Sequence, residues 1–226
     1  MKLAIFSDIH GNISFFRSCL TKMAEYQIDK YFFLGDAVGY MPYATEVLEL
    51  LDSINADCLM GNHDARICGF LEYSIESDDL FQNKRAALSL PEHLKTRMKS
   101  LLPYKFLSLD GMNILFAHGS PWNPLMGYVY PDSAESFYDN SELDFIFLGH
   151  SHHPFIQKNA HTTVVNVGSA GLPRDIGNMP SFIVLDTLTK EPKIVRLELE
   201  IQEILEDLKI KNVHEDVLSC LNRRSQ

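Results

Sequence analysis

The stretch LAIFSDIH at residues 3–10 predicts a buried β-strand that carries polar side chains to the edge of a sheet. Leu3 to Ser7 form a short apolar run of the kind found in fully buried strands, and Asp8 and His10 follow directly where the strand would end. The same arrangement recurs twice in this half of the chain: Tyr31 to Leu34 followed by Gly35-Asp36, and Cys58 to Met60 followed by Gly61-Asn62-His63-Asp64.

Segments with helical spacing separate these three runs. One apolar helix face consists of Phe15, Phe16, Cys19, Leu20 and Met23, and a second consists of Val47, Leu50, Leu51 and Ile54. An order of strand, helix, strand, helix, strand predicts parallel βαβ units, because a crossover helix packs back onto a parallel sheet. We therefore expect an α/β fold whose first three strands are parallel.

The second half of the chain has more closely spaced strands. Apolar or β-branched runs occupy Ile114 to Ala117, Phe145 to Leu148, Thr163 to Val167, Ser181 to Leu185 and Lys193 to Leu199. The first two of these runs end in His118-Gly119 and Gly149-His150-Ser151-His152. Since no helical segment separates the last two runs, this half predicts a more mixed or antiparallel sheet.

Two charged helical stretches complete the outline. The chain from about Asp78 to Leu102, with Pro91 suited to the first turn of a helix, predicts a cap or flanking segment at about residues 68–102. Ile201 to Leu221 return to helical spacing and should pack back on the body of the protein. The sequence contains no repeat or flexible linker, so we expect one domain over residues 1–226.

Composition limits the classes of function. With 226 residues and 46% hydrophobic content, the chain can bury a substantial core. Its formal net charge of -10 disfavours general binding to nucleic acid or to anionic membranes. The four cysteines show no CxxC spacing, which favours reduced thiols. Neither the start of the chain nor any later run has the length of a signal or membrane segment, so we expect a cytoplasmic protein with no membrane partner.

The polar residues at the ends of the apolar runs predict a metal site. In open α/β sheets, ligands bind beyond the carboxyl ends of the strands, where the loops converge. Each motif alone is common in turns, but five of them in one chain are not expected by chance. Carboxylate, imidazole and amide ligands without a thiolate suit Mn²⁺, Fe, Zn²⁺ or Ni²⁺, and this many ligands suit two ions.

Taken in order, these motifs resemble the signature of the calcineurin-like metallophosphoesterases, which reads D-x-H, G-D, G-N-H-[DE], H and G-H-x-H. The resemblance spans residues 8–152, and Gly168 to Asp175 are similar to a segment of small bacterial and archaeal, phosphodiesterase-like members. It implies a four-layer α/β/β/α sandwich of two mixed β-sheets flanked by helices. That architecture agrees with the parallel first half and the mixed second half.

The resemblance also implies a role for each motif residue. One metal ion would be held by Asp8, His10 and His152, the other by Asn62, His118 and His150, with Asp36 bridging the pair. Two divalent cations lower the pKa of a shared water enough to supply the hydroxide that attacks phosphorus in line. His63 is similar to the family histidine that protonates the leaving oxygen, with its imidazole oriented by Asp64.

Three further side chains are candidates for contacts to the substrate. We predict that Arg66 and Arg174 grip phosphate oxygens and that Asn12 donates to them. The alternative for Arg174 is a surface ion pair with the adjacent Asp175. The irregular loop Ser120 to Asp132 carries aromatic residues that either pack the loop down or line the entrance, namely Trp122, Tyr128 and Tyr130.

Three functions remain open at this point. The first is a dinuclear-metal phosphoesterase acting on a phosphodiester or a small nucleotide, with Mn²⁺ as the first expectation for the metal. The second is a phosphoprotein or dinucleoside polyphosphate hydrolase, although Gly35 to Tyr40 lack the arginine of the family's protein phosphatase branch and Asp64 stands in place of its glutamate. The third is a catalytically inactive protein-interaction scaffold, which the retention of His63 and all seven predicted ligands argues against. The physiological substrate and the oligomeric state are left open.

Overall fold

Two five-stranded mixed sheets form the centre of the protein. The computed structural model describes residues 1–72, 75–133, 139–140 and 142–224. The first sheet has the strand order β10-β9-β1-β2-β3, in which β1, β2 and β3 are parallel, whereas β9 is antiparallel to both β1 and β10. Its strands are β1 (Lys2–Phe6), β2 (Lys30–Phe33), β3 (Asp57–Cys58), β9 (Ser181–Asp186) and β10 (Glu191–Arg196).

The second sheet has the order β4-β5-β6-β8-β7, with a parallel centre of β5, β6 and β8 and an antiparallel strand at each edge. Its strands are β4 (Tyr104–Leu109), β5 (Met112–Ala117), β6 (Phe145–Leu148), β7 (Phe155–Lys158) and β8 (Thr163–Asn166). The predicted architecture of two mixed sheets, with a parallel first half of the chain, is therefore confirmed.

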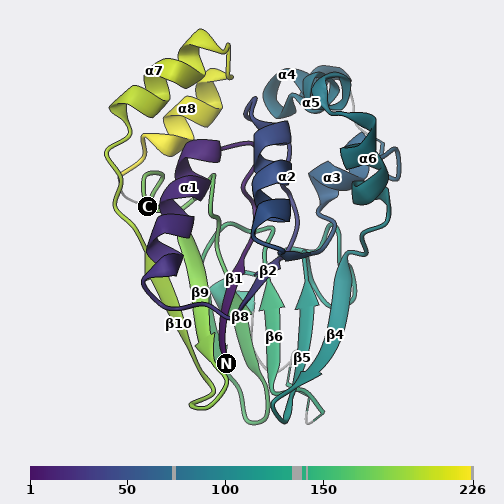
Figure 1. Ribbon diagram of the computed structural model, residues 1–226, viewed down its shortest axis with the longest axis vertical. Coiled ribbons are helices and arrows are strands. Elements are labelled where there is room, and N and C mark those ends of the chain that lie inside the picture. Colours follow the sequence, from purple (N-terminus) through teal and green to yellow (C-terminus); the bar gives the residue numbers. More distant parts are fainter. Residues whose placement is uncertain (73–74, 134–138, 141, 225–226) are drawn as a thin grey trace.

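Helices flank this pair of sheets. Figure 1 shows α1 and α2 side by side, with α7 and α8 on one side of them and α3 to α6 on the other. The helices are α1 (Ile13–Ala24), α2 (Ala44–Ser53), α3 (Asn62–Ile67), α4 (Ile75–Phe81), α5 (Asn83–Ser89), α6 (Glu92–Lys99), α7 (Gln202–Ile210) and α8 (Glu215–Leu221). A 3₁₀ turn, Pro131–Ser133, lies in the segment between β5 and β6.

The alternation of side chains along β1 explains how the layers are held together. Leu3 and Ile5 point to the second sheet, whereas Ala4 and Phe6 point to the helices, because successive residues of a strand face opposite sides. Both faces are buried from Leu3 onward, which is why the strand is apolar from Leu3 to Phe6. Between the sheets, the Phe116 ring stacks on Phe32 with the ring centroids 4.6 Å apart, so one aromatic contact joins the two sheets directly.

The predicted helical stretch at 78–102 consists of separate helices. The chain leaves α4 at Gln82, where a φ of 54° is incompatible with a continuing right-handed helix, and α5 begins at the next residue. Pro91 is the cap residue before α6 and not a residue of its first turn. We call residues 75–99 the cap segment. The tail is also divided, since α7 ends at Ile210 and α8 begins at Glu215.

The sequence prediction missed three elements. β4 alternates between exposed and half-buried positions and is joined to β5 by Asp110-Gly111, a typical hairpin signal. β7 is an antiparallel edge strand of four residues, of which only Phe155 and Ile156 are apolar. The third element is α3, whose first residue is Asn62. The GNHD motif therefore lies at the start of a helix and not in an extended loop.

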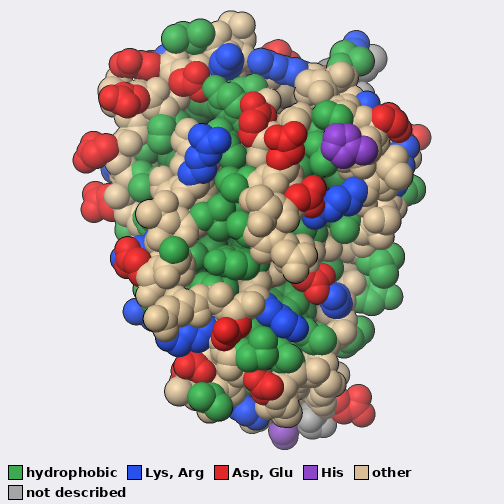
Figure 2. All heavy atoms as spheres, in the orientation of Figure 1, with side chains coloured by type: hydrophobic (Ala, Val, Ile, Leu, Met, Phe, Trp, Pro, Cys, Tyr) green, Lys and Arg blue, Asp and Glu red, His purple; other side chains and the backbone are tan. Residues whose placement is uncertain are grey.

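The surface agrees with the acidic composition. On the face shown in Figure 2, Lys and Arg side chains are scattered among acidic and apolar ones and do not form one basic area. Within the described parts of the chain, no helix combines the length and the apolar character needed to span a bilayer.

The contact between the sheets leads to a stability prediction. Phe116→Ala should lower the free energy of unfolding by about 3–5 kcal/mol, because it empties a buried aromatic site between two sheets. Phe106→Ala is the matched control, since that ring is 63% exposed on β4 and its loss should change stability by about 0.5 kcal/mol or less. Urea denaturation measures both values. Equal losses would contradict the assigned packing.

Candidate metal centre

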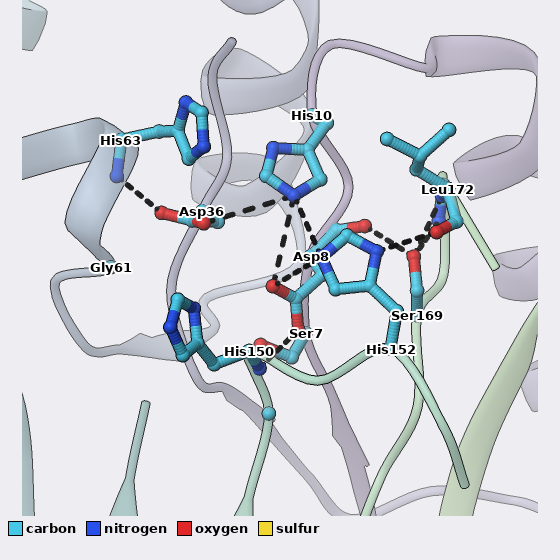
Figure 3. A network of polar contacts seen from close by, with 12 residues as sticks. Ser7, Asp8, His10, Asp36, Gly61, His63, His150, His152, Ser169 and Leu172 are labelled. Carbon is cyan, nitrogen blue, oxygen red and sulfur yellow. Dashed lines mark hydrogen bonds and ion pairs between the residues drawn. The ribbon is translucent and has the colours of Figure 1, made fainter. Parts of the chain in front are cut away.

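The polar motifs of the sequence meet at one end of the two sheets. Every one of the seven predicted ligands is buried and lies just beyond a strand of the parallel centres: Asp8 and His10 after β1, Asp36 after β2, Asn62 after β3, His118 after β5, and His150 and His152 after β6. Figure 3 shows side chains from both sheets pointing toward one another around Asp8 and Asp36. The first sheet and the second sheet thus supply opposite walls of one site.

The backbone at these strand ends is unusual. Five of the seven predicted ligands have positive φ angles, namely Asp8 (57°), His10 (51°), Asp36 (62°), His150 (63°) and His152 (60°). A residue with a side chain in this left-handed region costs roughly 1–2 kcal/mol, because its Cβ crowds the neighbouring carbonyl. Such strain persists only where the surrounding fold imposes it, and its concentration at these strand ends is typical of functional sites.

Asp8, His10 and His152 form the first group of side chains that could hold a metal ion. The two rings have backbone carbonyls at Nδ1, Val38 O at 3.0 Å from His10 and Leu172 O at 2.5 Å from His152. A carbonyl only accepts, so each Nδ1 carries the proton and each neutral Nε2 presents a lone pair. These Nε2 atoms lie 3.2 Å apart. Asp8 Oδ1, at 3.2 Å from His152 Nε2, has no hydrogen-bond partner among the described residues.

A second group consists of Asp36, His118 and His150, with the amide of Asn62 between them. His118 Nδ1 lies 2.9 Å from Leu34 O, so its Nε2 faces the site. One end of the Asn62 amide lies 3.0 Å from His118 Nε2, His150 Nδ1 and Asp36 Oδ2. An amide nitrogen in this position donates to His150 and Asp36, whereas an amide oxygen there would complete a set of four ligands for a cation.

Asp36 lies between the two groups. Its Oδ2 atom is 3.7 Å from His10 Nε2 and 3.4 Å from His118 Nε2, while its Oδ1 atom accepts the backbone N–H of His63 at 2.8 Å. The backbone of Gly61 packs so closely on this carboxylate that a Cβ at residue 61 would collide with Oδ1. The glycine of the GNHD motif therefore leaves room for the carboxylate that both groups share.

The charges of these groups are strongly coupled. Burial opposes ionisation of Asp8 and Asp36, but neighbouring imidazoles, His152 for Asp8 and His118 for Asp36, outweigh it, and both pKa values lie below the ordinary range. Burial also opposes the charge on His118, yet the Asp36 carboxylate raises the pKa of that histidine to about 9. Buried His150 has its pKa lowered to about 3. Asp8 and Asp36 are thus ionised, and their carboxylates favour a positively charged group, such as a metal ion or a protonated imidazole, in the space between them.

His63 and Asp64 do not form the predicted pair. The Asp64 carboxylate accepts backbone N–H groups of Gly61, Asp36 and Ala37 at 2.8–3.0 Å, and so holds the strand-end loop together and does not orient the His63 imidazole. The Nδ1 atom of His63 instead lies 3.2 Å from Asn83 Oδ1. The sequence prediction was wrong about this contact because residues 63 and 64, on consecutive positions of α3, point in different directions.

A cavity of about 280 Å³ opens onto both metal-ligand groups. Its polar lining includes Asp36, Asn62, His63, His150 and His152, and Arg66 and Arg174 add positive charge. The apolar lining consists of Tyr40, Leu80, Phe81, Met126 and Tyr128. A larger hollow of about 750 Å³ lies elsewhere, on the outer face of the second sheet beside Trp122, and none of the potential metal ligands lines it.

The three predicted substrate contacts have different surroundings. Arg66 and Arg174 line the cavity, and Arg174 donates to the Tyr40 hydroxyl at 3.1 Å. Asp175 pairs with Arg196 through two bonds of 2.5 and 2.9 Å, so the alternative ion pair between Arg174 and Asp175 is not formed. Asn12 does not line the cavity, because its amide donates to Gly171 O at 2.7 Å and its oxygen caps α1.

Sequence reasoning also missed several residues around the cavity. Tyr40 lies four residues after Asp36 and packs edge-on against the His10 ring and at a tilt against the His63 ring, so its place near the G-D motif was an available signal. Tyr128 stacks on His150 with centroids 4.0 Å apart, which favours the entrance-lining role for this aromatic of the loop. Leu80, Phe81 and Asn83 come from the cap segment, and nothing in the local sequence indicates that they approach the motifs.

Comparison with known proteins shows the family to which the chain belongs. The family model for the calcineurin-like phosphoesterase superfamily domain matches residues 1–190. The protein MJ0912 of Methanocaldococcus jannaschii is 31% identical over 235 residues, which cover 93% of this chain and 92% of that protein. The chain therefore belongs to the calcineurin-like phosphoesterase superfamily, whose members depend on metal ions.

Solved structures confirm the fold. The hypothetical protein PH1004 of Pyrococcus horikoshii OT3 superimposes with a TM-score of 0.87 at 23% identity, covering 98% of both chains. A metallophosphoesterase of Sphaerobacter thermophilus gives a TM-score of 0.82 at 23% identity, again with 98% of both chains covered. The predicted family resemblance and the predicted fold class are thus both confirmed.

The packing of Gly61 on Asp36 leads to a prediction about metal affinity. Gly61→Ala should weaken metal binding roughly 10- to 100-fold, because the added methyl displaces the carboxylate that the two groups share. Calorimetric titration of chelator-treated protein with Mn²⁺ measures the effect. Gly111→Ala is the control: a Cβ there meets nothing within 4 Å, and the strain from its φ of 73° should lower stability but leave metal affinity unchanged. Unchanged affinity in the Gly61 variant would show that Asp36 does not contribute to the metal site.

Proposed function

We propose that this protein is a dinuclear metal-dependent phosphoesterase that hydrolyses a small phosphodiester or a small nucleotide. The observation that supports it most strongly is the convergence of buried carboxylates and imidazoles in two neighbouring groups, with Asp36 Oδ2 3.7 Å from His10 Nε2 in one group and 3.4 Å from His118 Nε2 in the other. Superfamily membership supports the same class of reaction. The four cysteines are free, which fits our further proposal that the enzyme works in the cytoplasm.

The ligand chemistry fits two divalent ions. One ion would be held by Asp8, His10 and His152, and the other by Asn62, His118 and His150, with Asp36 reaching both. Imidazole, carboxylate and amide donors without a thiolate favour Mn²⁺ as the first candidate, with Fe, Zn²⁺ or Ni²⁺ as alternatives. Such ions, when bound, lower the pKa of a water molecule and neutralise charge on a phosphate.

The protein's own side chains would bind the phosphate and move a proton. Arg66 and Arg174 line the cavity and carry charge complementary to phosphate oxygens. Arg174 is held in place by Tyr40, which also packs on the His63 ring. His63 lines the same cavity and is our candidate for the group that gives a proton to the leaving oxygen. Asp64 would support the site through the strand-end loop.

The size of the cavity favours a small substrate. About 280 Å³ accommodates a phosphate with a modest organic group, and Tyr128 at its edge offers a ring on which a base could stack. A dinucleoside polyphosphate or a phosphoprotein would have to extend beyond the cavity and is the second candidate. The scaffold alternative is disfavoured because all seven predicted ligand side chains are present and buried, and four of them line the cavity together with His63.

Loss of the shared carboxylate tests the metal requirement. Asp36→Asn should abolish Mn²⁺-dependent hydrolysis of bis-p-nitrophenyl phosphate and p-nitrophenyl phosphate, because a neutral amide cannot replace a carboxylate between two cations. Metal content is measured in parallel by elemental analysis. Asp216→Asn, an exposed change at the start of α8, should leave turnover as it is. If the wild type shows no turnover with any of several divalent ions, the scaffold alternative gains support.

The proton-donor role is tested at His63. His63→Ala should lower kcat by about 100-fold or more for an ester with a basic leaving group, while the metal content stays at the wild-type level. His153→Ala, a change in the neighbouring histidine after the GHSH motif, is the control. A kcat within threefold of wild type would rule out His63 as the general acid, and loss of metal would indicate that His63 is a ligand instead, as its position near His10 and Asp36 permits.

A further inference from the structure

The His63 imidazole is held by a residue of the cap segment. Its Nδ1 atom lies 3.2 Å from the side-chain oxygen of Asn83, the first residue of α5. Asn83 is fully buried, and its amide nitrogen has no hydrogen-bond partner among the described residues. A buried amide that makes one polar contact, to a candidate catalytic ring 20 residues away in the sequence, needs an explanation.

Packing fixes the plane of the ring. Phe81 meets His63 edge to face, with centroids 5.1 Å apart and an interplanar angle of 89°, and Tyr40 lies 4.9 Å away on another side. Gly39 lies against the same edge of the ring, since a Cβ there would come within 2.6 Å of His63 Nδ1. The ring is therefore enclosed around Nδ1, and Asn83 is the polar group that reaches this atom.

Local backbone geometry brings Phe81 and Asn83 to the same ring. Gln82 between them has a φ of 54°, which turns the chain sharply from α4 into α5. The Phe81 carbonyl accepts the Tyr40 N–H at 2.6 Å, so the cap segment is tied to the loop after β2. At its outer side, Arg85 donates to Lys211 O at 2.7 Å and thereby links α5 to the turn between α7 and α8.

We propose that Asn83 is a positioning residue for His63. The Asn83 oxygen accepts the Nδ1–H of His63, which selects one tautomer of the ring and directs Nε2 into the cavity. The inference rests on the proposed function of His63 as proton donor. In the hydrolysis that this serves, the oxygen of water forms a new bond to phosphorus as the bond from phosphorus to the leaving oxygen breaks. The electron pair of the broken bond stays on the leaving oxygen, which takes the Nε2 proton of a His63 ring protonated on both nitrogens. The ring returns to the neutral Nδ1–H form, which Asn83 holds.

If Asn83 positions His63, the effect of losing Asn83 should depend on the leaving group of the substrate. A leaving group that departs readily as an anion needs no proton, whereas an alkoxide needs one in the transition state. Misplacing Nε2 should therefore slow esters with basic leaving groups far more than p-nitrophenyl esters. A purely structural role of Asn83 in the cap segment would slow all esters alike, so the dependence on the leaving group separates the two.

The experiment is a leaving-group series with purified, Mn²⁺-loaded protein. Rates are measured for p-nitrophenyl, phenyl and methyl esters, as monoesters or diesters according to which class the wild type hydrolyses. Asn83→Leu removes the acceptor at similar size and should lower kcat by roughly 10- to 100-fold for the methyl ester but less than about threefold for the p-nitrophenyl ester. Asn83→Asp keeps an acceptor oxygen and should retain the wild-type dependence.

Two controls exclude general damage. Asn178→Leu removes another buried amide, one that donates to Leu199 O, and should leave the leaving-group dependence unchanged. In a His63→Ala background, Asn83→Leu should cause no additional loss, because a positioning residue acts only through the group it positions. An additional loss in that background, or equal losses across the ester series, would overturn the proposal.

A second measurement does not depend on turnover. Nitrogen-15 chemical shifts of the imidazoles, with His63 assigned by His63→Gln, report which ring nitrogen carries the proton. The wild type should show the Nδ1–H form at His63, and Asn83→Leu should lose this preference. A tautomer unaffected by Asn83→Leu would refute the positioning role even if that variant is too unstable for kinetics. If wild-type protein hydrolyses none of the esters, the proposed function itself is wrong and this inference fails with it.

Discussion

The rest of the structure depends on the repulsion between hydrogen-bond acceptors that are buried side by side in the candidate metal centre. His10 and His152 donate through Nδ1 to backbone carbonyls, so their Nε2 lone pairs are directed at one another and at Asp8. A buried group of this kind is costly unless a cation or protons occupy the space between. The carbonyls of Val38 and Leu172 accept the Nδ1–H groups of the two histidines and so leave each Nε2 free to bind a metal ion.

The rest of the fold supplies what this arrangement requires. The parallel strands of both sheets end at the same edge of the sandwich. Residues with positive φ angles at these ends direct their side chains inward, and the packed cores offset the free-energy cost of that backbone conformation. The core between the sheets holds the two walls of the site at a fixed separation, with Phe32 and Phe116 in direct contact. The packing that stabilises the two sheets therefore also fixes the geometry of the candidate metal centre.

The cap segment adds the part of the site that the strands do not provide. It contributes Leu80 and Phe81 to the cavity wall and Asn83 to the His63 ring, so both the space for the substrate and the orientation of the candidate acid depend on it. Hydrogen bonds from Gln82 and Arg85 to the turn between α7 and α8 connect this segment to the C-terminal helices. Residues beyond the family-matched range 1–190 thus contact the cap segment, which lines the candidate site.

The sequence by itself determined the strand ends, the parallel order of the first half and the ligand types, because short apolar runs followed by Asp, Asn or His leave a local pattern that needs no tertiary information. Only the tertiary structure decided that Asp64 binds the backbone N–H of Gly61, that Asn12 caps α1, and that Asn83 faces His63. Side-chain direction on a short helix, and the approach of a distant segment to a motif, follow from long-range packing. Nearest neighbours in the sequence carry no signal for either.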